Sequence, residues 1–144
     1  MEQLIEQMRV ILGTNFGLYA KAHSFHWNVE GSNFNDYHAF LGTLYTTIFA
    51  NTDLIAEKIR MLGAYAPVSL ARLSELSDIE DETVIPGPMG MFATLQKDNE
   101  RFIYHLRAGI QAADNANEPA ISNFLQDLLD QHQKHAWMLK SIIK

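Results

Sequence analysis

The chain has 144 residues, no cysteine and a formal net charge of −6, and 47% of its residues are hydrophobic. This length and composition predict a single globular domain over residues 1–144 and exclude a disulfide framework or a thiolate metal site. The negative charge disfavours a nucleic-acid-binding surface, which would be basic. No apolar run reaches the ~20 residues of a membrane span. The N-terminus lacks the basic start of a secretory signal, so we expect a cytoplasmic protein.

Four long helices are predicted, because apolar residues recur every three or four positions. They span residues 1–27, 35–62, 89–113 and 119–143. The turn NVEGSN separates the first two helices, and Gly63 is a natural end for the second. Gly13 and Gly17 weaken the first helix, but their spacing would permit a close contact with another element.

A long connection, residues 64–90, lies between the second and third helices and is punctuated by prolines and glycines. Its middle, residues 69–79, could hold one short helix. A connection of this length joins parallel neighbours rather than the two halves of a hairpin. The predicted fold class is therefore all-α: a ferritin-like four-helix bundle with a long crossover that carries a short helix.

Residues suited to holding a metal ion gather between positions 23 and 63. Without cysteine, such an ion must be bound by His, Asp and Glu, which favours iron, manganese or zinc. Asp53 and Glu57 are four residues apart, so their carboxylates share one helix face and could share a cation. A solvated acidic pair is the alternative interpretation. His26 ends the first helix and His38 lies near the start of the second, where each could also be a packed histidine.

Helix length decides how these residues could meet. His38 and Asp53 are 15 residues apart on one predicted helix, roughly 22 Å along its axis, so they cannot bind one ion within one chain. If two copies of this helix pack antiparallel about a two-fold axis, His38 of one chain lies beside the acidic pair of the other. Provided that the four residues form one site, each site combines His26 and His38 of one chain with Asp53 and Glu57 of its partner.

A metal site inside one bundle is disfavoured. Di-iron four-helix proteins place Glu-x-x-His motifs on their inward helix faces. This chain contains no Glu-x-x-His. The absence favours a site between subunits.

The sequence resembles the Dps-like mini-ferritins, the DNA-protection proteins of starved cells. The similarity is carried by KAHSFHWNVEGSNF, DLIAEKIRMLG, APVSLARLSELSDI and KHAWMLKS, which are distributed over nearly the whole chain. The resemblance implies a hollow dodecamer of four-helix bundles. It also implies that Fe(II) is oxidised between two-fold-related subunits, preferably by hydrogen peroxide rather than oxygen, and is stored inside as a ferric mineral.

Carried over by position, the resemblance implies that the catalytic metal ligands are His26, His38, Asp53 and Glu57. Trp27 matches the family's tryptophan beside this centre, where it could trap stray oxidising equivalents, although simple packing would also account for it. Iron is the implied cofactor, and zinc or manganese could occupy the same site.

One departure from the family concerns the metal ligands. The family's usual further ligand is an Asp or Glu four residues after the second histidine, and Gly42 stands at that position here. Asn35 and Thr46 lie nearer the correct face but are weak ligands. We therefore expect one firm metal position per site and a second that is weak, water-bridged or empty. The alternative function is a metal-binding or structural Dps-like shell with weak or no ferroxidase activity.

A second departure concerns DNA. Some family members bind DNA through a basic terminal tail. This chain begins MEQLIEQ and ends SIIK, so binding to DNA through a tail is not expected.

Other polar residues have structural interpretations at least as good as functional ones. His132 and His135 could share a metal ion, but packing or hydrogen bonding is favoured. His23 could be an entry residue or a buried, hydrogen-bonded histidine. Three acids of the fourth helix could line an iron entry path or lie on a solvated face: Glu118, Asp127 and Asp130.

Overall fold

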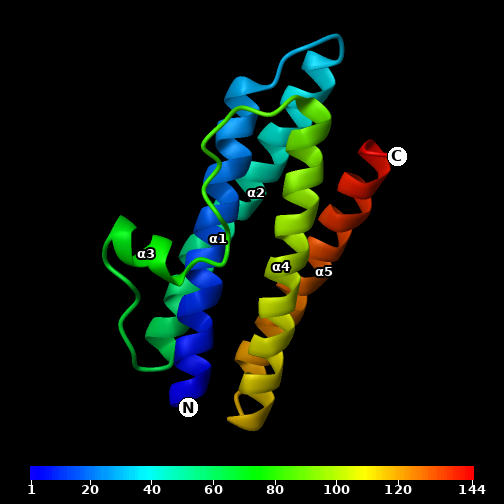
Figure 1. Cartoon of the computed structure of the whole chain (residues 1–144). Coiled ribbons are helices and arrows are strands. Elements are labelled where there is room, and N and C mark those ends of the chain that lie inside the picture. Colours follow the sequence, from blue (N-terminus) through cyan, green and yellow to red (C-terminus); the bar gives the residue numbers. More distant parts are fainter.

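The computed structural model describes all residues, 1–144, and its only regular elements are helices. In chain order these are α1 (Glu2–Asn28), α2 (Phe34–Met61), α3 (Leu70–Leu76), α4 (Pro88–Asn115) and α5 (Pro119–Ile142). The four long helices form an elongated bundle, and α3 lies outside it against α1 (Figure 1). The predicted all-α bundle with a short crossover helix is confirmed, and each helix end lies within three residues of its predicted position.

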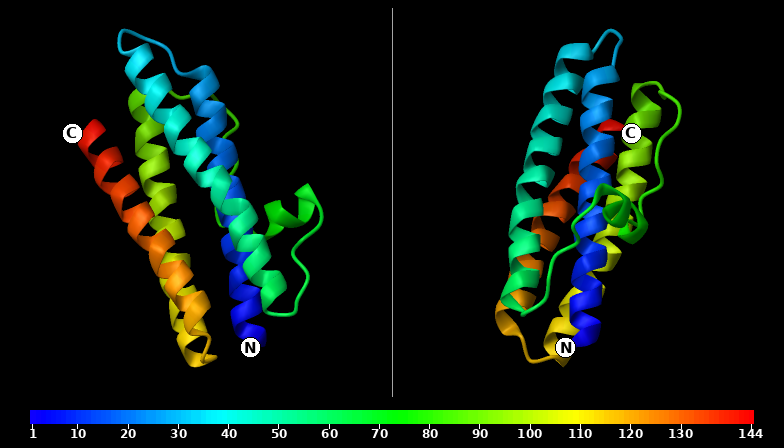
Figure 2. Two further views of the ribbon diagram at one scale, coloured as in Figure 1. Left: turned by 180° about the vertical axis from the view of Figure 1, so that it is seen from behind. Right: turned by 90° about the vertical axis from the view of Figure 1, so that its left-hand side faces the viewer.

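The bundle is made of two helical hairpins. α1 packs antiparallel to α2, and α4 packs antiparallel to α5 (Figure 2). The crossover carries the chain back along the bundle, so that α2 and α4 run parallel (Figure 1). This is the connection that the length of the crossover predicts.

Glycine and proline mark the helix ends as the sequence predicts. Gly63 follows α2 with φ +89°, a backbone conformation that residues with a Cβ seldom adopt. Its N–H donates a hydrogen bond to the carbonyl oxygen of Arg60 at 3.0 Å, which satisfies one of the unpaired carbonyls at the end of the helix. Pro88 and Pro119 each occupy the first turn of a helix, where a missing N–H costs nothing.

The core is a single cluster of 25 buried hydrophobic residues drawn from all four long helices, with Val29 of the first turn and Ile79 of the crossover. Phe92 and Phe102 of α4 are its largest fully buried side chains. Burying a side chain of this size contributes about 1.5–3 kcal/mol, so the core makes a firm base for the polar groups outside it. No helix combines the length and apolarity needed to cross a bilayer.

The contact predicted for the two glycines of α1 is formed with the crossover. A Cβ added to Gly13 would lie 2.7 Å from the carbonyl oxygen of Leu73, and one added to Gly17 would lie 2.5 Å from Oγ of Ser77. Both distances are shorter than real side chains tolerate. The glycines therefore let α3 and the residue after it approach the backbone of α1.

Gly13→Ala is expected to lower the free energy of unfolding by about 1–3 kcal/mol, the usual cost of overpacking. Helix propensity alone predicts the opposite, a gain of roughly 1 kcal/mol. The clash decides, because it involves the main-chain carbonyl of Leu73 and not a flexible side-chain end. Urea unfolding at fixed protein concentration measures the change. Gly87→Ala is the control, since a Cβ there meets nothing within 4 Å. A stabilised Gly13→Ala protein would contradict the close approach.

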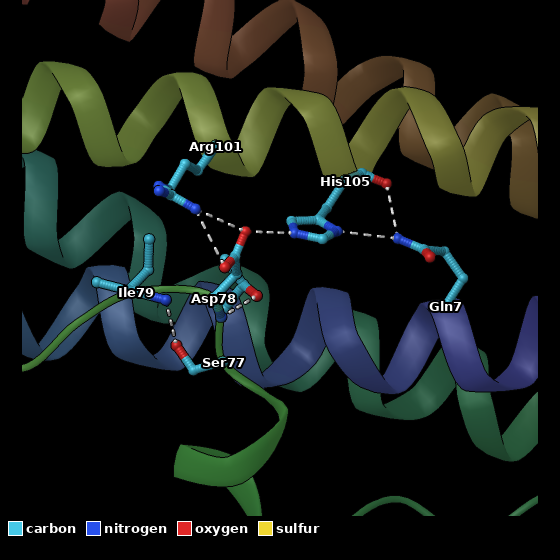
Figure 3. A network of polar contacts seen from close by, with 7 residues as sticks. Gln7, Ser77, Asp78, Ile79, Arg101 and His105 are labelled. Carbon is cyan, nitrogen blue, oxygen red and sulfur yellow. Dashed lines mark hydrogen bonds and ion pairs between the residues drawn. The ribbon is translucent and has the colours of Figure 1, made fainter.

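A polar network fixes the crossover, just after α3, against α1 and α4 (Figure 3). Asp78 accepts a hydrogen bond from Nε2 of His105 at 2.9 Å and two from Nη1 of Arg101 at 3.2 and 3.3 Å. The His105 hydrogen bond, and secondarily the Arg101 charge, lower the pKa of Asp78. Gln7 of α1 donates to Nδ1 of the same imidazole at 3.3 Å. His105 lies 27 residues from Asp78 and 98 from Gln7, so no local sequence pattern predicts these contacts.

A buried ion pair joins α1 directly to α4. Nζ of Lys21 lies 2.7 Å from Oδ2 of Asp98, and the two side chains are only 6% and 11% exposed. Nothing in the sequence singles out these residues, which lie 77 positions apart.

Candidate functional site

The turn between α1 and α2 brings two of the predicted site residues together. His26 lies in the last turn of α1 and His38 in the second turn of α2. Their imidazole rings stack with centroids 3.8 Å apart and planes inclined by 13°. Residues 29–33 are too few to separate the two helix ends, so the hairpin itself creates this contact.

The two histidines hold each other through reciprocal hydrogen bonds to the backbone. Nδ1 of His26 lies 2.7 Å from the carbonyl oxygen of His38, and Nδ1 of His38 lies 2.7 Å from the carbonyl oxygen of His26. A carbonyl can only accept, so each Nδ1 carries a hydrogen and donates it. In the neutral form each Nε2 then has a free lone pair. Histidine ligands of metals are commonly oriented in this way, through the ring nitrogen that does not bind the metal.

The predicted carboxylates lie far from this pair within one chain. Asp53 and Glu57 are exposed, one turn apart on α2, and roughly 22 Å along the helix from His38. Neither forms a salt bridge within the chain. No group of three or more His, Asp or Glu side chains in the chain is placed to hold a metal ion. Within one chain, the imidazole pair and the carboxylate pair are therefore two separate sets of candidate metal ligands.

The position of the expected further ligand carries no polar side chain. Gly42 lies one turn after His38, against the ring of His26. The hydroxyl of Thr46 donates a hydrogen bond to the carbonyl oxygen of Gly42 at 2.7 Å. Asn35 lies exposed in the first turn of α2.

Aromatic residues of both α1 and α2 lie beside the histidine pair. The ring of His23 stacks on Tyr45 with centroids 3.7 Å apart, and its Nδ1 lies 3.0 Å from the hydroxyl of Tyr19. Burial, and then the proximity of His26, lower the pKa of His23. Trp27 is 65% exposed, and its ring centroid lies 4.4 Å from that of His23. No motif in the sequence singles out the two tyrosines, although Tyr19 and His23 are four residues apart and so share one helix face.

The histidines of α5 belong to a different part of the bundle. Nδ1 of His132 lies 2.7 Å from Oδ1 of Asn99, whose amide donates to the carbonyl oxygen of His132 at 2.9 Å. His132 is fully buried, and the rings of His132 and His135 meet edge to face at 4.8 Å. Nε2 of His132 and Nδ1 of His135 have no hydrogen-bond partner. Burial lowers the pKa of both, that of His135 to about 4.

Comparison with known proteins defines the class to which the chain and its fold belong. A family model described as a ferritin-like domain matches residues 5–144. The chain belongs to the ferritin-like family.

Individual relatives narrow the class to the Dps-like mini-ferritins. The DNA protection during starvation protein 2 of Bacillus anthracis is 30% identical over 142 residues, which cover 99% of this chain and 97% of that protein. The crystal structure of a Dps protein from Bacillus brevis matches with a TM-score of 0.95 and 26% identity, covering 99% of this chain and 96% of that one. A Dps protein from Vibrio cholerae, described as a ferritin-like diiron-carboxylate protein, shares the fold with a TM-score of 0.95 at 22% identity, covering 99% and 90%.

Proposed function

We propose that this chain is the subunit of a hollow, dodecameric iron-storing shell and that it oxidises Fe(II) at sites between two subunits. Each site takes His26 and His38 from one chain and Asp53 and Glu57 from its partner. The observation that carries the proposal is the stacked histidine pair, whose two Nδ1–H groups are engaged and whose two Nε2 atoms are free. Two imidazoles and two carboxylates suit iron.

The separation of the two halves on α2 supports a site between subunits. One chain cannot bring its histidines and carboxylates to one ion, whereas a two-fold axis across α2 pairs each half with the complementary half of the partner. Exposed apolar side chains on the same helix, Phe49 and Leu54, suit a face that packs against another copy.

The chemistry is an electron transfer from iron to peroxide. Two Fe(II) ions each give one electron to hydrogen peroxide, whose O–O bond breaks to leave two hydroxide ions. The Fe(III) formed then hydrolyses and grows as mineral in the cavity. Consuming peroxide and Fe(II) together at a protein site prevents them from reacting freely in solution.

The test is Glu57→Ala. Loss of groups that only orient metal ligands costs about 10–100-fold in activity or affinity, so loss of a ligand is expected to slow Fe(II) oxidation by peroxide at least as much. The change in absorbance of Fe(III) measures the initial rate, and light scattering checks that the oligomer is intact. Asp114→Ala, which removes an exposed carboxylate of α4, is the matched control. Equal rates for Glu57→Ala and the control would remove this site from the mechanism.

Gly42 favours a second candidate function, a metal-binding or structural shell with weak or no ferroxidase activity. The residue supplies no ligand where the family's further carboxylate is expected. Iron uptake by the unmodified protein with peroxide and with oxygen separates the candidates. Sluggish uptake with both oxidants, together with one bound ion per site, would support the shell. DNA binding is not expected in either case, and a mobility shift at moderate salt would contradict that expectation.

A further inference from the structure

Two histidines of α5 form a buried polar cluster that the proposed iron site does not use. His132 and His135 are three residues apart, so they are neighbours on one face of the helix. Their rings meet edge to face with centroids 4.8 Å apart. Nε2 of His132 and Nδ1 of His135 are buried and have no hydrogen-bond partner. Buried polar atoms are rarely left unpaired, so these two nitrogens require an explanation.

The contact with Asn99 shows which nitrogen of His132 carries the proton. The amide of Asn99 donates from Nδ2 to the carbonyl oxygen of His132 at 2.9 Å, so its Oδ1 is the atom that faces Nδ1 of the ring, at 2.7 Å. Oδ1 can only accept, and Nδ1 therefore carries a hydrogen. Burial lowers the pKa of His132, which keeps the ring neutral near pH 7. Nε2 then has a free lone pair, and the ring is oriented through its other nitrogen, as in histidine ligands of metals.

His135 lies between this buried lone pair and a groove at the surface. Its side chain lines a groove of about 420 Å³ between α2 and α5, and Met138, three residues further along α5, lines the same groove. Burial lowers the pKa of His135 to about 4, so this ring is also neutral near pH 7. With its proton on Nε2, the ring has a lone pair on Nδ1. The groove supplies the entry path that a metal site requires, and Met138 brings a thioether to it.

The chemistry of these donors favours one kind of cation. The residues that line the groove include no Asp or Glu, and Lys134 is the charged side chain among them. A divalent ion would be buried here without a compensating charge, at a cost that rises with the charge of the ion. Thioethers select Cu(I), and imidazoles also bind copper. Cu(I) carries a single charge and accepts low coordination numbers, so two nitrogens and one sulfur are sufficient ligands.

We propose that α5 carries a second metal site, which binds Cu(I) through Nε2 of His132, Nδ1 of His135 and the sulfur of Met138. Binding requires the ring of His135 to turn its Nδ1 toward Nε2 of His132, and the adjacent groove provides the space. All three ligands belong to one helix of one chain. The site therefore needs neither a partner subunit nor the oxidation of iron, and this proposal can fail without the proposed iron site.

The experiment titrates the assembled protein with Cu(I) in the absence of oxygen, in competition with a chromophoric Cu(I) chelator. The unmodified protein is expected to bind one Cu(I) per subunit at this site. His135→Gln and Met138→Leu are each expected to raise the Kd by at least about tenfold, the lower end of the cost of disturbing the ligands of a metal. Met61→Leu, which removes an exposed thioether at the end of α2, is the matched control and should bind Cu(I) as the unmodified protein does.

His26→Ala distinguishes the two sites. This variant removes a ligand of the proposed iron site and leaves α5 intact, so it is expected to keep the Cu(I) that His135→Gln loses. Loss of that Cu(I) in His26→Ala, or an unchanged Kd in either His135→Gln or Met138→Leu, would overturn the inference.

A crystal soaked with Ag(I) gives a readout that does not depend on affinity. Ag(I) has the charge and softness of Cu(I) but is not oxidised in air. Its anomalous scattering is expected to show a peak within bonding distance of Nε2 of His132 and Nδ1 of His135. A map with no peak between these two rings would contradict the proposed ligands.

Discussion

Lys21→Ala is expected to lower the free energy of unfolding by about 3–5 kcal/mol, the usual cost of removing one partner from a buried ion pair. The Nζ of Lys21 and Oδ2 of Asp98 are 2.7 Å apart and almost completely shielded from water. Without the lysine, the carboxylate of Asp98 stays between α1 and α4 with no compensating charge. Urea unfolding at fixed protein concentration measures the loss, since assembly also contributes to apparent stability.

Two further variants show whether burial is the reason for this large effect. The double variant Lys21→Met, Asp98→Leu removes both charges and is expected to recover most of the lost stability, because a buried pair contributes little beyond an apolar pair of similar volume. Arg72→Ala breaks a pair with Glu75 in which both side chains are about half or more exposed, and it should cost no more than about 0.5 kcal/mol. Equal losses in Lys21→Ala and Arg72→Ala would contradict this account.

Acid is expected to destabilise the bundle through the two histidines of α5. His135 has a pKa lowered to about 4, and His132 has a pKa well below its usual value of 6.5, chiefly because both are buried. Below pH 6.5 the unfolded chain therefore binds more protons than the folded chain, so stability falls as the pH is lowered from 6.5 towards 4. For His135 alone the loss by pH 4 is about 3 kcal/mol. The pKa of Asp78 is lowered from its usual value of 3.8. Asp78 therefore also makes the folded chain less stable in acid, but only as the pH falls to 3.8 and below.

The measurement is the free energy of unfolding between pH 7.5 and 4.5 for the unmodified protein and for His135→Gln. The variant lacks one of the two buried histidines of α5, so its stability should fall less steeply over this range. Lys144→Gln, an exposed change beyond α5 that leaves every histidine in place, is the comparison. The same slope in His135→Gln as in the unmodified protein would show that acid acts elsewhere.

The sequence predicts the scaffold well because helices depend on local patterns. The apolar spacing predicts the four long helices, and the helix rise alone shows that His38 and Asp53 cannot share an ion in one chain. The tertiary contacts of polar side chains are different. The pairing of Lys21 with Asp98 joins residues 77 positions apart, and no local pattern connects them.

The details of the candidate site also depend on how two helix ends meet. The sequence places His26 and His38 on neighbouring helices, but their reciprocal hydrogen bonds require the particular turn that joins those helices. The same limit applies to Gly42. In the sequence it marks a missing carboxylate, and the structure adds that a Cβ there would lie 3.1 Å from Cε1 of His26. Only the packing of one helix on the other reveals this close approach.

The hydrogen bonds between His26 and His38 also affect the entropy of metal binding. Free imidazole side chains would lose rotational freedom when a cation fixed them, and this loss would weaken binding. Here each ring is already fixed by a backbone carbonyl and by stacking on the other ring. The two side chains lose their conformational freedom when the hairpin folds, and burial of the hydrophobic core offsets this loss. A cation that binds later therefore meets ligands that are already ordered.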